Sequence, residues 1–238
     1  VLPWSVEALL EEGARFRSAY RPISILPPDQ YRAIVLQATE GCSWNRCTFC
    51  NFYMDRPFRL RSVGEFERHL EAVRSLLGKG LRLRHGVFLA DGNALALSNR
   101  RLDPLLDRVG EAFPEQPLTG FVDLYSGERR TIGEWQHLRA RGLRRVYVGM
   151  ETGLDALLQF VNKPGSAAEM EGFVATLKDA GLEVSLIVMV GLGGREYRQS
   201  HRTASHELLT KMSLDRRDLI YLSPFVEHPD TSYTCRRH

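Results

Sequence analysis

Residues 34–50 read IVLQATEGCSWNRCTFC and join a short apolar run to three closely spaced cysteines. The run at residues 34–38 has the length and apolar character of a buried strand. Cys42, Cys47 and Cys50 follow it, and three thiolates this close in sequence can share one metal centre. A structural zinc site is closed by four protein ligands, whereas a catalytic centre keeps one position open. The stretch therefore predicts a strand followed by a metal centre with a free coordination position.

The length fits one large domain or two small ones. The chain has 238 residues, 43% of them hydrophobic, close to the roughly 250 residues of an α/β barrel. Its 32 basic and 29 acidic residues give a net charge of +3, which does not by itself demand a nucleic-acid partner.

The first residues, the longest apolar run and the cysteines together indicate where in the cell to expect the protein. The first fifteen residues lack the basic start of a signal peptide, and the longest apolar run, residues 184–192, is too short for a membrane span. Bunched cysteines do not form a secreted disulfide framework. We expect a cytoplasmic protein without a membrane segment.

Strand-like and helix-like runs alternate along the chain, which predicts βαβ units and a parallel sheet. The expected strands are Ile34–Ala38, Gly86–Ala90, Gly120–Leu124, Arg145–Gly149, Val184–Val190 and Leu219–Ser223. The expected helices are Val63–Leu77, Asn99–Phe113, Ile132–Arg141, Asp155–Val161, Ala167–Ala180 and His201–Lys211. We divide the chain into an N-terminal helical appendage (1–30), a main domain (31–226) and a short C-terminal tail (227–238).

Polar or glycine-rich residues follow every expected strand. In parallel α/β folds the functional groups collect at the carboxyl ends of strands, so these residues are candidates for the site. Besides the cysteines they are Asp91, Gly92, Asn93, Ser126, Glu151, Gly191, Gly193, Tyr221 and Ser223.

With these motifs the sequence resembles the radical S-adenosylmethionine (radical SAM) superfamily, over roughly residues 31–226. The resemblance implies an α/β partial (βα)6 TIM-like barrel with parallel strands. It also implies a [4Fe–4S] cluster on Cys42, Cys47 and Cys50, with SAM chelating the fourth iron. Such an enzyme cleaves SAM reductively to a 5′-deoxyadenosyl radical, which abstracts hydrogen from a substrate that the sequence does not name. An electron donor such as flavodoxin or ferredoxin is then an expected partner.

The resemblance also suggests how SAM is bound. Phe49 matches an aromatic residue that packs near the adenine, and Glu151, in Gly-Met-Glu-Thr-Gly, matches the Gly-x-Glu-Ser-Gly pattern of the subgroup related to methylthiotransferases and coproporphyrinogen dehydrogenase. Asp91-Gly92-Asn93 stands where the family often has Gly-Gly-Glu, which receives the SAM amino group. The remaining implied contacts are Ser126 for the carboxylate, Gly191 and Gly193 for the nucleoside, and Tyr221 and Ser223 beside the adenine.

The cysteine spacing departs from the family pattern, and three other interpretations stay open. The cysteine spacing is C-x4-C-x2-C, where the family usually has C-x3-C-x2-C. A closed zinc site in a non-catalytic binding module is the alternative, with Cys235 or a histidine as fourth ligand. A third interpretation keeps the radical chemistry and directs it at tRNA. Glu151 on its own would also suit a helix start, where the dipole favours a carboxylate.

Overall fold

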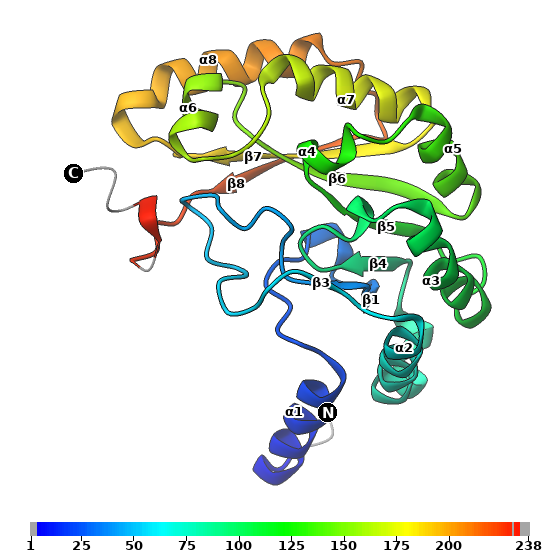
Figure 1. Ribbon diagram of the computed structural model, residues 1–238. Helices are drawn as coiled ribbons and strands as arrows, with labels where there is room; N and C mark the ends of the chain where they lie inside the picture. The colour runs from blue at the N-terminus through cyan, green and yellow to red at the C-terminus, as the bar shows by residue number, and fades with distance from the viewer. Residues whose placement is uncertain (1–3, 230, 234–238) are drawn as a thin grey trace.

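The computed structural model describes residues 4–229 and 231–233. Its main sheet has six parallel strands in the order β1-β4-β5-β6-β7-β8, so strands that follow one another in the chain are neighbours in space. The fold is the α/β partial (βα)6 barrel that the sequence predicts (Figure 1). The strands are β1 (Ile34–Gln37), β4 (Val87–Ala90), β5 (Leu118–Val122), β6 (Leu143–Glu151), β7 (Glu183–Val190) and β8 (Leu219–Pro224).

Helices lie on the outer face of the sheet, between successive strands (Figure 1). Ser62 and Thr131 cap α2 and α5 with full capping boxes, and the Ser166 side chain caps α7 by accepting from the Glu169 amide. Within the described residues, no helix is long and apolar enough to cross a membrane. The helices are α1 (Val6–Ala19), α2 (Val63–Leu77), α3 (Asn99–Ala112), α4 (Leu124–Gly127), α5 (Ile132–Ala140), α6 (Asp155–Phe160), α7 (Ala167–Asp179) and α8 (Gly194–Lys211).

One helix differs clearly from its prediction. α8 begins at Gly194, whereas the sequence predicts a start at His201 because Gly193 and Gly194 suggest a loop. Gly193 is instead the N-cap residue, with φ +80° in the left-handed region that favours glycine. The glycine pair therefore marks the start of the helix.

The segment after α1 packs into the barrel. α1 itself projects from the body of the molecule, and the chain that follows it runs back to the sheet (Figure 1). The Tyr20 hydroxyl donates to the Val35 carbonyl at 2.9 Å, and the Arg21 amide donates to Gln37 Oε1 at 3.0 Å. Residues 20–30 thus lie against the free edge of β1 and enter the open side of the partial barrel.

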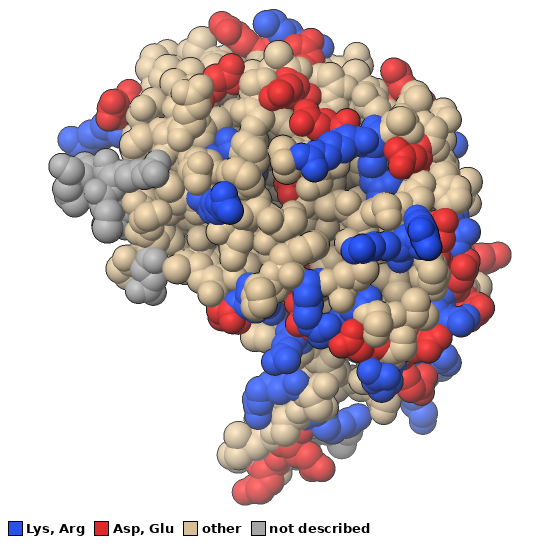
Figure 2. Space-filling model, in the orientation of Figure 1, with Lys and Arg blue, Asp and Glu red and all other residues tan. Residues whose placement is uncertain are grey.

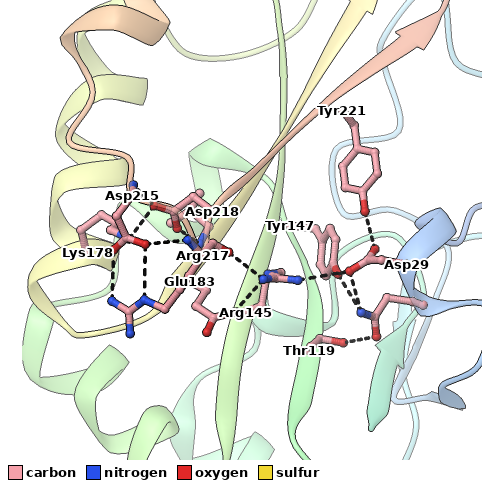
Figure 3. A network of polar contacts seen from close by, with 12 residues as sticks. Asp29, Thr119, Arg145, Tyr147, Lys178, Glu183, Asp215, Arg217, Asp218 and Tyr221 are labelled. Carbon is pink, nitrogen blue, oxygen red and sulfur yellow. Dashed lines mark hydrogen bonds and ion pairs between the residues drawn. The ribbon is translucent and has the colours of Figure 1, made fainter. Parts of the chain in front are cut away.

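Asp29 fixes the inner end of this segment. Its carboxylate accepts hydrogen bonds from the Tyr147 hydroxyl of β6 at 2.5 Å and the Tyr221 hydroxyl of β8 at 2.6 Å (Figure 3). Arg145 lies 3.2 Å from the same carboxylate. Burial acts to raise the pKa of Asp29, but the two hydroxyls, Gln30 and Arg145 outweigh it, so the pKa is lowered. Residues 20–30, which we call the amino-terminal segment, therefore place polar side chains inside the barrel, below the carboxyl ends of the strands. We call this polar layer the floor.

His69 of α2 joins the amino-terminal segment to β1 from the outside. The buried ring accepts a hydrogen bond from the Gln37 amide at Nε2 and donates from Nδ1 to the Ala19 carbonyl, both at 2.9 Å. An amide can only donate and a carbonyl can only accept, so the ring must be neutral with its proton on Nδ1. Burial first, and Arg61 second, lower the pKa of His69 from 6.5 to about 4.

We expect His69→Leu to destabilise the metal-free protein by about 2–3 kcal/mol at pH 7, because the buried Gln37 amide loses its acceptor. In the unfolded chain the ring gains a proton near pH 6.5, whereas the folded ring stays neutral to about pH 4. The stability that the neutral ring gives is therefore present above pH 6.5 and is lost as the pH falls. The gap between wild type and variant should shrink by roughly 2 kcal/mol from pH 7 to pH 4.5.

Urea unfolding at the two pH values measures this gap. The exposed His206 provides the control, since His206→Leu should show no such change with pH. A His69→Leu gap that stays constant between the two pH values would contradict the neutral-ring assignment.

Candidate active site

Three cysteine side chains open onto one cavity at the carboxyl ends of the strands. Cys42, Cys47 and Cys50 all line this cavity, whose volume is about 320 Å³. Glu151, the last residue of β6, and Ser223, near the end of β8, line it as well. A cavity of this size suits one cofactor-sized ligand beside the cysteines.

The cysteines lie on a loop that is closed at its base. This cysteine loop, residues 41–58, leaves β2 (Thr39–Glu40) and returns through β3 (Arg59–Leu60), which pairs with β2 in antiparallel fashion. At the start of the loop the Gly41 amide donates to Asp91 Oδ2 at 3.1 Å. The first cysteine is thus held next to the end of β4.

The middle of the loop is held by the far side of the barrel and by the C-terminal tail. The Thr48 amide donates to the Val161 carbonyl, and the Tyr233 amide donates to the Thr48 carbonyl, both at 2.9 Å. The Tyr233 ring is buried and packs on Phe225 and Phe160, with ring centroids 4.7 and 5.9 Å away. The tail therefore closes the cavity on the side where β8 has no further strand beside it.

Asp91 holds the cysteine loop in place and does not itself line the cavity. Burial raises the pKa of this carboxyl to about 6, against the opposing effects of the Gly41 amide and the Arg56 guanidinium. Arg56 Nη1 lies 3.8 Å from Asp91, and Nη2 of the same side chain donates to the Pro22 carbonyl at 3.1 Å. Asp91 and Arg56 together tie the cysteine loop to β4 and to the amino-terminal segment.

Asn93 also has a supporting position. The side chain is fully buried, and its amide group bonds to Ser43 at 2.6 Å, to Ser126 at 3.1 Å and to the Asp123 carboxylate. Its carbonyl accepts from the Asp123 amide at 3.0 Å. Asp123, which follows β5, is the member of this group that lines the cavity.

A buried ion pair is the strongest charge feature of the cavity. Lys163 Nζ lies 3.1 Å from Glu151 Oε1, and both side chains line the cavity. Glu151 Oε2 is buried and has no hydrogen-bond partner among the described residues. Gly149 makes room for the pair, because a Cβ there would lie 3.2 Å from Lys163 Nζ and closer still to Glu151. An unpartnered buried carboxylate oxygen in a cavity calls for a donor from a ligand.

Burial and the ion pair set the protonation of these groups. Burial acts to lower the pKa of Lys163, but Glu151 outweighs it and the pKa lies above its usual value, so the lysine is charged. Burial raises the pKa of the Cys47 thiol to about 12, although Lys163 acts in the opposite direction. Burial also raises the pKa of Cys50. The protein alone therefore does not hold these sulfurs as thiolates, and a bound metal centre would have to displace their protons.

The structure divides the residues expected at the site into two groups. The cavity is lined by all three cysteines and by Phe49, Gly92, Glu151 and Ser223. Outside its lining lie Asp91, Asn93, Ser126, Gly191, Gly193 and Tyr221. Gly193 donates its amide to the Tyr233 hydroxyl at 2.9 Å, and Tyr221 binds Asp29 in the floor. Cys235, the fourth ligand of the zinc alternative, lies outside the described residues.

Two charged residues that line the cavity, Asp123 and Lys163, are not predicted from the sequence. Asp123 stands directly after β5, and a strand boundary placed two residues earlier would have singled it out. Lys163 follows α6 and precedes Pro164, and nothing in its local sequence distinguishes it from a surface lysine.

We expect Gly92→Ala to disturb the first cysteine. A Cβ at Gly92 would lie 2.7 Å from Tyr53 Cε2 and 3.1 Å from Cys42 Cβ, so the buried Tyr53 ring or the loop backbone would have to shift. Overpacking of this kind costs about 1–3 kcal/mol, measured by urea unfolding of the metal-free protein. Gly110→Ala on α3 is the control, because its Cβ meets nothing within 4 Å and should stabilise the helix by up to about 1 kcal/mol. Equal unfolding midpoints for Gly92→Ala and wild type would contradict the close packing described here.

Comparison with known proteins identifies the family that this sequence matches. A family model described as the radical SAM superfamily matches residues 36–205. No curated protein sequence matches the chain.

Solved structures resemble the fold at low sequence identity. Coproporphyrinogen III oxidase (HemN) from Escherichia coli, a radical SAM enzyme, has a TM-score of 0.66 at 14% identity, over 98% of this chain and 50% of that one. Methylornithine synthase (PylB) has a TM-score of 0.60 at 16% identity, over 96% of this chain and 63% of that one. The cobalamin-dependent S-adenosylmethionine radical enzyme OxsB has a TM-score of 0.58 at 17% identity, over 86% of this chain and 29% of that one. The chain therefore spans less than two thirds of each of these proteins, and the likeness concerns the fold.

Proposed function

The chain belongs to the radical SAM superfamily of enzymes, and we propose that its cavity binds a [4Fe–4S] cluster on Cys42, Cys47 and Cys50 with SAM beside it. When bound, the cluster supplies the electron that cleaves SAM into methionine and a 5′-deoxyadenosyl radical. The observation that carries the proposal is the shared cavity, where three cysteines face a buried ion pair with one unpartnered carboxylate oxygen. We place this chemistry in a reducing cytoplasm, because free thiols and such clusters persist there.

The ligand set fits a cluster better than a single zinc ion. Among residues 4–229 and 231–233, no three Cys, His, Asp or Glu side chains are arranged to hold one metal ion. A cluster does not require the three sulfur atoms to meet at one ion, because each thiolate binds a different iron. Three cysteines then leave one iron free for the amino and carboxylate groups of SAM.

The charged pair suits the methionyl end of SAM. Lys163 is buried and positive, so it can hold the SAM carboxylate, which is negative. Glu151 Oε2 can accept from the SAM ammonium group or from a ribose hydroxyl. Phe49 and Phe225, which pack edge to face at 6.5 Å, offer an apolar wall for the adenine. Ser223 lies on the same lining and remains a proposed contact, as does the backbone of Gly92.

The floor and the tail give these side chains their positions and keep water out. Asp29 holds β6 and β8 together below the cavity, and Tyr233 packs the tail over the cysteine loop. We propose that residues 31–226 form the catalytic unit and that residues 20–30 complete it by closing the open side of the barrel. An enclosed, preorganised site protects a radical from water and from side reactions.

The direct test is SAM cleavage by the anaerobically reconstituted protein. With dithionite as reductant, we expect wild type to form 5′-deoxyadenosine and Cys47→Ala to form none, because one iron loses its ligand. Iron and sulfide should be bound in wild type, with little zinc. A Cys47→Ala protein that still formed 5′-deoxyadenosine would falsify the assignment.

A second test concerns the ion pair. In Lys163→Met the SAM carboxylate loses its counter-charge, so we expect the dissociation constant for SAM to rise about 10- to 100-fold with the iron content unchanged. The double variant Glu151→Gln/Lys163→Met leaves no unpaired buried carboxylate, so urea unfolding of the two variants shows whether the single variant is impaired by instability. Lys79→Met, at an exposed lysine that does not line the cavity, is the matched control. An unchanged SAM affinity in both Lys163 variants would remove Lys163 from the proposed site.

A further inference from the structure

Two aromatic rings and two guanidinium groups form a continuous row of contacts outside the cavity. The Trp44 and Tyr125 ring centroids are 6.1 Å apart. Arg46 stands 5.5 Å from the Trp44 centroid, and Arg129 stands 3.9 Å from the Tyr125 centroid. These four residues, which we call the aromatic–arginine rim, join the cysteine loop to the region of α4.

The rim is held in place from below. Trp44 Nε1 donates to the Asn162 carbonyl at 2.9 Å, and the Asn162 side chain donates back to the Arg46 carbonyl at 2.8 Å. Ser43 adds a bond from its hydroxyl to Asp123 Oδ2 at 3.2 Å, which ties the two loops together. The backbone that carries Trp44 and Arg46 is therefore fixed, and the rim is a built surface.

The charged groups of the rim are free to bind a partner. Tyr125 is 41% exposed, and Arg46 and Arg129 are exposed. Across the described part of the chain, neither guanidinium makes a hydrogen bond or an ion pair with a carboxylate. Figure 2 shows basic side chains over the cysteine loop and over α4 on one face, with a largely uncharged surface between them.

The stacking selects the kind of partner. Each ring already has a guanidinium over one face, so a nucleic-acid base would have to displace that guanidinium to stack there. A stacked guanidinium still presents its N–H groups at its edges, where they match a carboxylate in bidentate fashion. Tryptophan, tyrosine and arginine are also the residues that most often carry binding energy in protein interfaces. The arrangement favours an acidic protein surface over single-stranded RNA.

The rim is also next to the metal ligands. Arg46 directly precedes Cys47, so their Cα atoms are about 3.8 Å apart, and Trp44 lies between Cys42 and Cys47 in the chain. A protein seated on these side chains would bring its own redox centre close to the three sulfurs.

We propose that the aromatic–arginine rim is the docking surface for a small acidic redox protein that delivers the electron for SAM cleavage. The inference rests on the proposed function, since that function requires one electron from outside. In the step, the donor is oxidised by one electron and the cluster is reduced by one, and no bond forms or breaks. The charges of the rim steer the donor, and its rings provide the contact area.

The experiment uses flavodoxin as the acidic donor and two charge-reversal variants. Arg46→Glu/Arg129→Glu reverses the rim, and Arg68→Glu/Arg82→Glu makes the same change in net charge at exposed positions on α2 and the turn after it. Binding of labelled, oxidised flavodoxin to the metal-free proteins measures docking without a cluster. Stopped-flow reduction of the reconstituted proteins, by reduced flavodoxin and separately by dithionite, measures electron delivery.

At low salt we expect the rim variant to lose at least about tenfold in flavodoxin affinity and in reduction rate by flavodoxin. The control variant should stay within about twofold of wild type, and dithionite should reduce all three proteins equally. Higher salt should narrow the difference, because it screens the charges.

Several results would overturn the proposal. Equal flavodoxin binding by wild type and the rim variant would do so, as would an equal loss in the control variant. A loss of rate with dithionite as well would show damage to the cluster in place of a docking role. A short labelled single-stranded RNA that bound the rim in preference to flavodoxin would also contradict it. Failure of the proposed function can be told apart from failure of the docking proposal. If the proposed function is wrong, none of the proteins, wild type included, will hold a reducible cluster. The binding measurement on the metal-free proteins still tests docking in that case.

Discussion

The gathering of three thiols, all partly buried, around one cavity is the constraint on which the site depends. Burial raises the pKa of Cys47 to about 12, and Lys163, the buried cation of the cavity, does not offset it. Three thiolates there need a multivalent metal centre, since a lone buried charge costs far more than a paired one. The loop backbone is fixed at two residues before any metal binds: Asp91 holds Gly41, and Val161 and Tyr233 both hold Thr48.

The fold supplies these anchors from distant parts of the chain. The carboxyl ends of parallel strands lie at the same end of the barrel. Asp91 after β4, Asp123 after β5 and Glu151 at the end of β6 therefore lie close together. Six strands do not close a barrel, so the two ends of the described chain complete it. Residues 20–30 insert Asp29 beneath the site, and the segment after β8 carries Tyr233 across its edge.

The sequence predicts the sheet, the three cysteines and Glu151 because each has a local signal: an apolar run, a spacing or a motif after a strand. The alternation of residues along a strand predicts which face of the sheet a side chain lies on. It does not predict how far the side chain is from the carboxyl end of the strand, where the cavity lies. Tyr221 and Ser223 lie on the same face of β8, but Tyr221 is two residues, about 7 Å, further from the carboxyl end and reaches Asp29 instead of the cavity. Asn93 and Lys163 show the other limit, because their positions depend on partners such as Asp123 and Glu151 that are far away in sequence.

Mössbauer spectroscopy of the protein reconstituted with ⁵⁷Fe distinguishes a cluster with one free iron from a closed metal site, because it resolves the irons of a cluster individually. We expect a [4Fe–4S] signal in which about one quarter of the iron, the part without a cysteine ligand, changes its isomer shift when SAM is added. A spectrum in which SAM changes no iron, or a protein that retains zinc and no iron, would contradict this expectation.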